Sequence, residues 1–260
     1  MRAILFDMDG VVYNSETPID GAAEALAWLR AQGIPHLFAT NTSARTRRQL
    51  AEKLNRFGIA ATEDDVLTPS LAAAGWLREC ATGPVALFVK ESTWSEFSGL
   101  TILPPAAETG AQYVVIGDLE DEWNFRTLNR AFRLLHSNPE AELIALGMTR
   151  YWLGKNGMQL DVAPFVAALE HATGRKPLVF GKPDAPLFHA AAARLGVPCE
   201  EILMIGDDIE ADVGGAQRAG LKGALVRSGK FRPADLERGV TPYTILDSVA
   251  SLPEWWTQAK

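Results

Sequence analysis

The chain has 260 residues, of which 47% are hydrophobic and 22% are charged. This composition is typical of a globular protein, and the length allows one large or two modest domains. Acidic residues outnumber basic residues by 32 to 25, so the formal net charge is −7. Such a chain lacks the basic field that attracts nucleic acids, and we expect no nucleic-acid partner.

The cysteine content and the distribution of apolar residues predict a cytoplasmic protein. The two cysteines, Cys80 and Cys199, are too few for a disulfide framework. The apolar run near the amino terminus is interrupted by Asp7 and Asp9 and does not resemble a secretion signal. Since no apolar stretch is long enough to cross a bilayer, we also expect no membrane contact.

The first part of the chain alternates predicted strands with predicted helices. Residues 3–6 form a short apolar run that predicts a buried strand, and a helix is predicted over 21–32. A second strand is predicted over 35–40 and a second helix over 45–57. This β-α-β-α order predicts a parallel sheet covered by helices.

The last third of the chain repeats the pattern. Helices are predicted over 188–195 and 213–219, strands over 201–205 and 223–226, and a terminal helix over 247–256. The two ends of the chain together predict an α/β fold, a Rossmann-like doubly wound parallel sheet.

The middle of the chain predicts a separate α+β module. Its predicted elements are strands over 85–89, 113–116 and 143–146 and helices over 125–136 and 164–172, with Asp161 as the N-cap of the second helix. Asn156-Gly157 is a strong hairpin signal within residues 151–160. We therefore predict a cap domain over 80–178, inserted into a core domain formed by 1–79 and 179–260.

Polar residues follow three of the predicted parallel strands. Asp7 and Asp9 follow the first strand, Thr40 and Asn41 the second, and Asp207 and Asp208 the later one, with Asp212 close behind. Lys182 lies just before the helix that leads to the strand of Asp207. Because ligands bind beyond the carboxyl ends of the strands in an open parallel sheet, we expect these side chains to share one rim.

The residue types at this rim indicate phosphoryl chemistry. Crowded carboxylates need a cation, and ligands that are all oxygen favour Mg²⁺ where a substrate phosphate completes the shell. Asp7 could then attack phosphorus to form a covalent aspartyl-phosphate, and Asp9 could serve as general acid and base. Lys182 would hold the phosphoryl oxygens, with hydrogen bonds from Thr40.

The order of these motifs resembles that of the haloacid dehalogenase superfamily. The matching segments are Asp7-x-Asp9-Gly10, Thr40-Asn41, Gly181-Lys182-Pro183 and Gly206-Asp207-Asp208-x-x-x-Asp212. Their spacing is similar to that of the NagD-like branch, whose large cap lies between the second and third motifs. Gly229-Lys230-Phe231-Arg232 and Arg150-Tyr151 look most like the phospholysine, phosphohistidine and pyrophosphate phosphatase group.

The resemblance implies specific roles. Asp7 would be the nucleophile and Asp9 the acid/base, while Mg²⁺ would be held by Asp7, the carbonyl of Asp9 and Asp207. Thr40, Asn41 and Lys182 would bind the phosphate of a small phosphorylated substrate. Members of the family often dimerise through their caps, so the resemblance implies a possible homodimer. Vertebrate members of the group carry serine in place of Asp9, which loosens the link to their substrates.

Several alternatives remain open at this stage. Asp208 and Asp212 could ligate the metal directly or support its ligands. Arg150 and Tyr151 could contact the substrate or simply pack the cap. The same scaffold could also transfer phosphate to an acceptor other than water, or bind phosphate as a regulatory protein without turnover. Dehalogenation is disfavoured, because it needs neither a metal nor the proton donor that Asp9 provides.

Overall fold

The computed structural model describes residues 1–154 and 157–258. Contacts divide the chain into two compact units. We call Met1–Thr40, Arg47–Leu67 and Lys182–Lys260 the core unit, and Asn41–Thr46 with Thr68–Gly181 the insert unit. Across the described residues, no helix combines the length and the apolar character needed to span a membrane.

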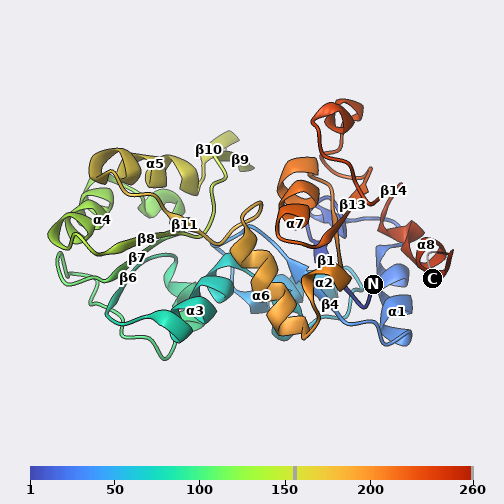
Figure 1. Ribbon diagram of the computed structural model, residues 1–260, viewed down its shortest axis with the longest axis horizontal. Helices are drawn as coiled ribbons and strands as arrows, with labels where there is room; N and C mark the ends of the chain where they lie inside the picture. Colours follow the sequence, from blue (N-terminus) through green and yellow to red (C-terminus); the bar gives the residue numbers. More distant parts are fainter. Residues whose placement is uncertain (155–156, 259–260) are drawn as a thin grey trace. The chain divides into compact units, whose positions relative to one another are not determined.

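The core unit is built on a six-stranded parallel sheet with the order β14-β13-β12-β1-β4-β5. Figure 1 labels β14, β13, β1 and β4 of this sheet. Its strands are β1 (Ala3–Asp7), β4 (His36–Ala39), β5 (Val66–Leu67), β12 (Ile202–Gly206), β13 (Lys222–Val226) and β14 (Thr244–Leu246). The chain first runs outward from β1 to β5, and later from β12 to β14 on the other side. The strand order therefore reverses between β1 and β12, where such sheets bind ligands.

Helices cover the core sheet, as its continuous apolar strands require. Helices α1 (Ala22–Ala31), α2 (Arg47–Arg56) and α8 (Leu252–Gln258) share one apolar cluster with Phe6 of β1. Helix α6 (Ala185–Leu195) contacts β4 and packs against α7 (Gly215–Arg218). The predicted α/β class, a doubly wound parallel sheet, is confirmed.

Short elements of the core unit differ in detail from the predicted ones. A small antiparallel hairpin, β2 (Tyr13–Asn14) with β3 (Thr17–Pro18), follows β1. The helix predicted over 213–219 begins earlier, as a π-helical turn over Ile209–Gly214 that leads into α7. The terminal helix predicted over 247–256 starts as a 3₁₀ turn at Val249–Ser251 and continues as α8.

The insert unit has its own parallel sheet, with the order β11-β8-β7-β6. Its strands are β6 (Val85–Phe88), β7 (Tyr113–Ile116), β8 (Glu142–Ala145) and β11 (Leu178–Val179), and its helices are α3 (Pro69–Cys80), α4 (Phe125–Ser137) and α5 (Val162–Thr173). Side chains alternate between the two faces of a strand. Val114 and Ile116 of β7 share a cluster with α4 and α5, whereas Tyr113 meets Trp76 of α3.

Two features of the insert unit bear on the predicted domain limits. Residues 68–79 belong to this unit, in which Trp76 of α3 meets Tyr113 of β7. The predicted limits at 80 and 178 themselves stay a prediction. Strands β9 (Tyr151–Gly154) and β10 (Gly157–Leu160) form an antiparallel hairpin, but Asn156, on which the predicted turn rests, lies outside the described residues.

Candidate active site

The strands on either side of the sheet reversal end in carboxylates. In the parallel register, Phe6 of β1 lies beside Ile205 of β12. Asp7 is the last residue of β1, and Asp207 directly follows β12. The apolar residues of both strands are completely buried, so the sheet holds these two acids at one edge.

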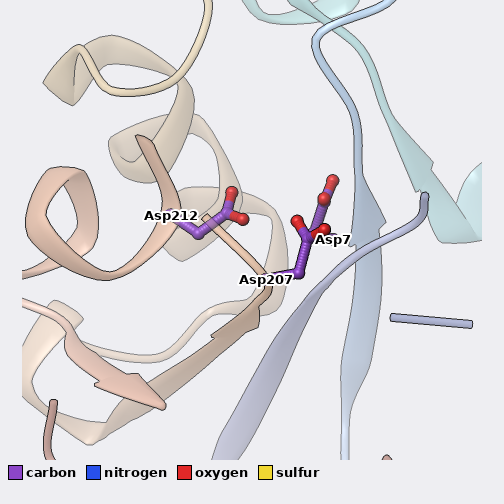
Figure 2. A group of neighbouring side chains, drawn as sticks. All are labelled: Asp7, Asp207 and Asp212. Carbon is purple, nitrogen blue, oxygen red and sulfur yellow. The ribbon is translucent and has the colours of Figure 1, made fainter. Parts of the chain in front are cut away.

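A third carboxylate joins this pair. Oxygens of Asp7, Asp207 and Asp212 lie within 4.8 Å of one another, and Figure 2 shows the three side chains grouped together. All three residues are buried, at 8%, 1% and 1% exposure. Such a group of buried carboxylates is unfavourable unless positive charge balances it. We call these three residues the carboxylate triad.

Lys182 supplies part of the balancing charge. Its Nζ atom lies 2.6 Å from Oδ1 of Asp7 and 2.7 Å from Oδ1 of Asp212. Burial alone would lower the pKa of Lys182, but the charges of Asp212 and Asp7 outweigh it and raise that pKa above its ordinary value. The lysine therefore stays protonated and joins two members of the triad.

One lysine does not neutralise three carboxylates. Burial and the nearby charge of Asp7 raise the pKa of Asp207 to about 6, although the N–H of Lys230 opposes the shift. Burial also raises the pKa of Asp212, and the cation of Lys182 only partly offsets it. The triad thus keeps an excess of negative charge that a bound cation would remove.

The hydrogen bonds of Asp207 provide a test of whether a metal fits here. Its Oδ2 accepts a hydrogen bond of 2.7 Å from the backbone N–H of Lys230. Its Oδ1 is buried and accepts no hydrogen bond from any residue that the structure describes. A buried carboxylate oxygen without a donor is unfavourable, and a hard cation held by oxygen ligands would satisfy it. The donor set therefore fits a cation such as Mg²⁺ or Ca²⁺.

Glycines make room for the triad. A Cβ atom at Gly10 or Gly229 would lie 2.0 or 2.1 Å from Oδ2 of Asp207, and one at Gly206 would lie 2.2 Å from Cβ of Asp212. Gly10 and Gly229 also have φ angles of +86° and +70°, which side chains rarely adopt. Any larger residue at these positions would displace a carboxylate.

Asp208 and Asp212 occupy different surroundings. The side chain of Asp208 caps the π-helical turn by accepting hydrogen bonds from the N–H groups of Glu210 and Ala211. Its own N–H donates a hydrogen bond of 3.1 Å to Oδ2 of Asp212. The turn therefore brings Asp212 into the triad and uses Asp208 as a cap.

Asp9 lies next to the triad in sequence but outside it. The residue is exposed, and its Oδ1 accepts a hydrogen bond of 3.0 Å from the N–H of Ser15 in the hairpin that follows β1. Tyr13 of the same hairpin is buried, and burial together with the charges of Asp9 and Asp7 raises its pKa. The carboxyl group of Asp9 therefore lies at the surface beside this hairpin.

The other candidate residues are placed as follows. Thr40 directly follows β4, and its N–H donates a hydrogen bond to the carbonyl of Leu67. Asn41 begins the insert unit, where its side chain lies beside Gly181. Their roles in phosphate binding stay predictions.

Arg150 and Tyr151 belong to the insert unit and are exposed there. The guanidinium of Arg150 lies 6.0 Å from the ring centroid of Tyr151. Exposure is consistent with either a contact to substrate or a plain surface position. Their role in substrate specificity therefore stays a prediction.

The structure adds one segment to the site that the sequence did not single out for chemistry. Ser228, Gly229 and Lys230 follow β13, the strand next to β12. The Ser228 hydroxyl donates a hydrogen bond of 2.7 Å to the carbonyl of Gly10. The rule that polar residues follow parallel strands applies to this segment too, and it is the signal that would have found it.

Comparison with known proteins shows the family to which the chain is similar. The model of the haloacid dehalogenase-like hydrolase family matches residues 4–102, and a second, HAD-hydrolase-like model matches 179–252. The human phospholysine phosphohistidine inorganic pyrophosphate phosphatase is 38% identical over 90% of this chain and 86% of that protein. Bovine haloacid dehalogenase-like hydrolase domain-containing protein 2 is 37% identical over 95% of this chain and 93% of that protein.

Solved structures of other proteins have a similar fold. The p-nitrophenyl phosphatase from Archaeoglobus fulgidus superposes with a TM-score of 0.87 at 29% identity, covering 98% of both chains. NagD from Escherichia coli superposes with a TM-score of 0.86 at 25% identity, covering 96% of this chain and 97% of that one. The chain belongs to the haloacid dehalogenase-like hydrolases. The predicted enzyme class, a hydrolase of the phosphatase type in this superfamily, is confirmed.

Proposed function

We propose that this protein is a Mg²⁺-dependent phosphatase that hydrolyses small phosphorylated metabolites through a covalent aspartyl-phosphate on Asp7. The observation that supports the proposal best is the buried carboxylate triad, in which Lys182 contacts Asp7, and Oδ1 of Asp207 has no hydrogen-bond partner among the described residues. Asp7 and Asp207 would hold the cation, together with the carbonyl of Asp9. When bound, Mg²⁺ would neutralise the carboxylates and attract the phosphoryl oxygens of the substrate.

Each residue has a distinct task in the proposed reaction. A carboxylate oxygen of Asp7 attacks phosphorus, and the bond from phosphorus to the leaving oxygen breaks. The carboxyl group of Asp9 donates its proton to that oxygen and becomes a carboxylate. Asp9 then takes a proton from water, whose oxygen attacks the acyl phosphate, releasing phosphate and restoring the Asp7 carboxylate. Lys182 keeps Asp7 oriented and places a fixed positive charge beside the phosphoryl group.

The substrate class is inferred from the relatives. Their names refer to phospholysine, phosphohistidine, inorganic pyrophosphate and p-nitrophenyl phosphate. The bond broken in this protein is accordingly a phosphomonoester, with phosphoramidate and pyrophosphate bonds as further candidates. We place the protein in the cytoplasm, acting on a metabolite without a nucleic-acid or membrane partner, as a monomer or a homodimer.

The proposal is tested with p-nitrophenyl phosphate, with and without Mg²⁺, in wild type and Asp7→Asn. We expect turnover by the wild type only when Mg²⁺ is present, and loss of at least about 10³-fold in Asp7→Asn. Asp247→Asn is the matched control, because the Asp247 side chain is 81% exposed and pairs with Arg227 at the surface. Turnover without metal, or an active Asp7→Asn variant, would refute the proposal.

The same assay separates the alternatives. A phosphatase releases nitrophenol and inorganic phosphate in equal amounts. A phosphotransferase given an alcohol as acceptor would release less phosphate than nitrophenol. A regulatory phosphate-binding protein would release neither, and acid quenching would trap no radiolabelled phosphate on the chain.

A further inference from the structure

The segment Ser228–Lys230 surrounds one member of the carboxylate triad. The Lys230 N–H donates its hydrogen bond to Oδ2 of Asp207, so that oxygen is fixed by backbone. Gly229 approaches so closely that its Cβ position lies 2.1 Å from Oδ2 of Asp207 and 2.5 Å from Cα of Gly10. The carboxylate of Asp207 therefore lies in a slot between two glycines of different loops.

A side-chain hydrogen bond closes this slot. The Ser228 hydroxyl donates to the carbonyl of Gly10, which connects the loop after β13 to the loop after β1. Gly10 directly follows Asp9, whose carbonyl is proposed to face the cation. The segment thus touches both loops that carry proposed metal ligands.

We propose that Ser228–Lys230 is a positioning segment that holds Asp207 in its metal-binding orientation. The N–H of Lys230 occupies Oδ2, which leaves the unpaired Oδ1 as the oxygen available to the cation. Groups that orient a metal ligand without touching the metal typically change metal affinity by about 10- to 100-fold when they are removed. The proposal rests on the Mg²⁺ site of the proposed function and adds the residues that organise it.

Two substitutions in this segment should weaken Mg²⁺ binding to different extents. Ser228→Ala removes the hydrogen bond to Gly10 without adding bulk, and we expect the Kd for Mg²⁺ to rise about 10-fold. Gly229→Ala places a methyl group against Oδ2 of Asp207, and we expect the Kd to rise by about 100-fold or more. Gly239→Ala is the matched control, because Gly239 has a similar φ of +77° but, apart from its chain neighbours, none of the described residues comes within 4 Å of its Cβ position.

The measurement is calorimetric titration of each variant with Mg²⁺ alone, alongside urea unfolding without metal. Both glycine variants should lose stability through backbone strain, but only Gly229→Ala should lose Mg²⁺ affinity. In Ser228→Ala, kcat for p-nitrophenyl phosphate should return to near the wild-type value once Mg²⁺ is saturating. A purely structural defect would instead lower kcat at every Mg²⁺ concentration.

The outcomes distinguish this inference from the function on which it rests. If wild type binds Mg²⁺ and Ser228→Ala binds it equally well, the positioning role is wrong and the proposed phosphatase stands. Equal losses of affinity in Gly229→Ala and Gly239→Ala would also overturn it, because strain alone would then explain the effect. If wild type binds no Mg²⁺, the proposed function fails and this inference fails with it.

Discussion

The ammonium of Lys182 lies 2.6 Å from the Asp7 carboxylate, and both residues are buried. Asp7 lies in the first segment of the core unit and Lys182 begins the last one, so the whole insert unit lies between them in the sequence. The pair gives Asp7 one fixed neighbour before any substrate arrives. Because Lys182 also contacts Asp212, one cation orders two of the three carboxylates.

Replacing this lysine should affect stability as well as activity. Lys182→Met leaves buried carboxylates without their cation, a change that typically lowers the free energy of unfolding by about 3–5 kcal/mol. We expect urea unfolding to show this loss without metal and a partial recovery with saturating Mg²⁺. Lys176→Met is the control, because the Lys176 side chain is 90% exposed. A Lys182→Met variant as stable as this control would contradict the charge balance described above.

The proposed role of Asp9 as proton donor predicts that the effect of its removal on kcat/KM depends on the leaving group. Asp9→Asn removes the proposed acid/base, a kind of group that typically contributes about 10²- to 10⁴-fold to the rate. Nitrophenolate leaves without a proton, whereas an alkoxide needs one. We therefore expect a larger loss of kcat/KM with an alkyl phosphate than with p-nitrophenyl phosphate. Equal losses with both substrates would argue against protonation of the leaving group by Asp9.

The two acids of the π-helical turn should respond differently to the same change. Asparagine caps helices about as well as aspartate, so Asp208→Asn should keep both cap hydrogen bonds and most of the activity. Asp212→Asn removes a charge that contacts Lys182, and we expect a loss of about 10-fold or more in kcat/KM. The comparison is made with p-nitrophenyl phosphate at saturating Mg²⁺. A reversed order of effects would assign the metal-site role to Asp208.

Asp161 predicts a pH-dependent stability in the insert unit. Burial raises the pKa of this carboxyl from 3.8 to about 6, with a smaller opposing effect from the N–H of Val162 that it caps. The folded state therefore binds the proton more tightly than the unfolded chain, so stability falls as pH rises from about 4 to about 6. Asp161→Asn cannot ionise and still caps α5.

We expect Asp161→Asn to match wild type near pH 4 and to exceed it above pH 6. The gain should be about 1 kcal/mol once solvent screening is taken into account. Calorimetric melting across this pH range measures it. Asp121→Asn, which alters an exposed acid of the same unit, should show no such gain. A gain that is independent of pH would point to a cause other than ionisation.

Much of the core could be predicted from residues alone, because its signals are local. The apolar run over 3–6 lies within β1, which ends at Asp7, and the residues after β12 begin with Asp207. Both acids follow from the rule that parallel strands present polar residues at one edge. Helix α5 begins after its predicted N-cap, Asp161. These features needed no knowledge of contacts between distant segments.

Other features depend on contacts that no local pattern reveals. The sequence does not show which sheet α3 covers, whereas in the structure Trp76 of α3 meets Tyr113 of β7, and both belong to the insert unit. Asp208 and Asp212 are both acids near the start of a helix, and only the π-helical turn separates a cap from a triad member. The role of Gly229 depends on its closeness to Asp207, which the sequence does not show.

The pairing of β1 with β12 also shapes how the chain must be made. Strand β1 leaves the ribosome early, yet its partner β12 follows only after the entire insert unit has been synthesised. During that interval, one apolar edge of β1 remains unpaired, and open edges of this kind promote aggregation. The insert unit has its own sheet and apolar cluster, so it can fold before β12 of the core unit has been synthesised. Asp7, the proposed nucleophile, is therefore synthesised first, and Lys182, Asp207 and Asp212 follow only after the insert unit, so a chain interrupted within the insert unit has an incomplete site.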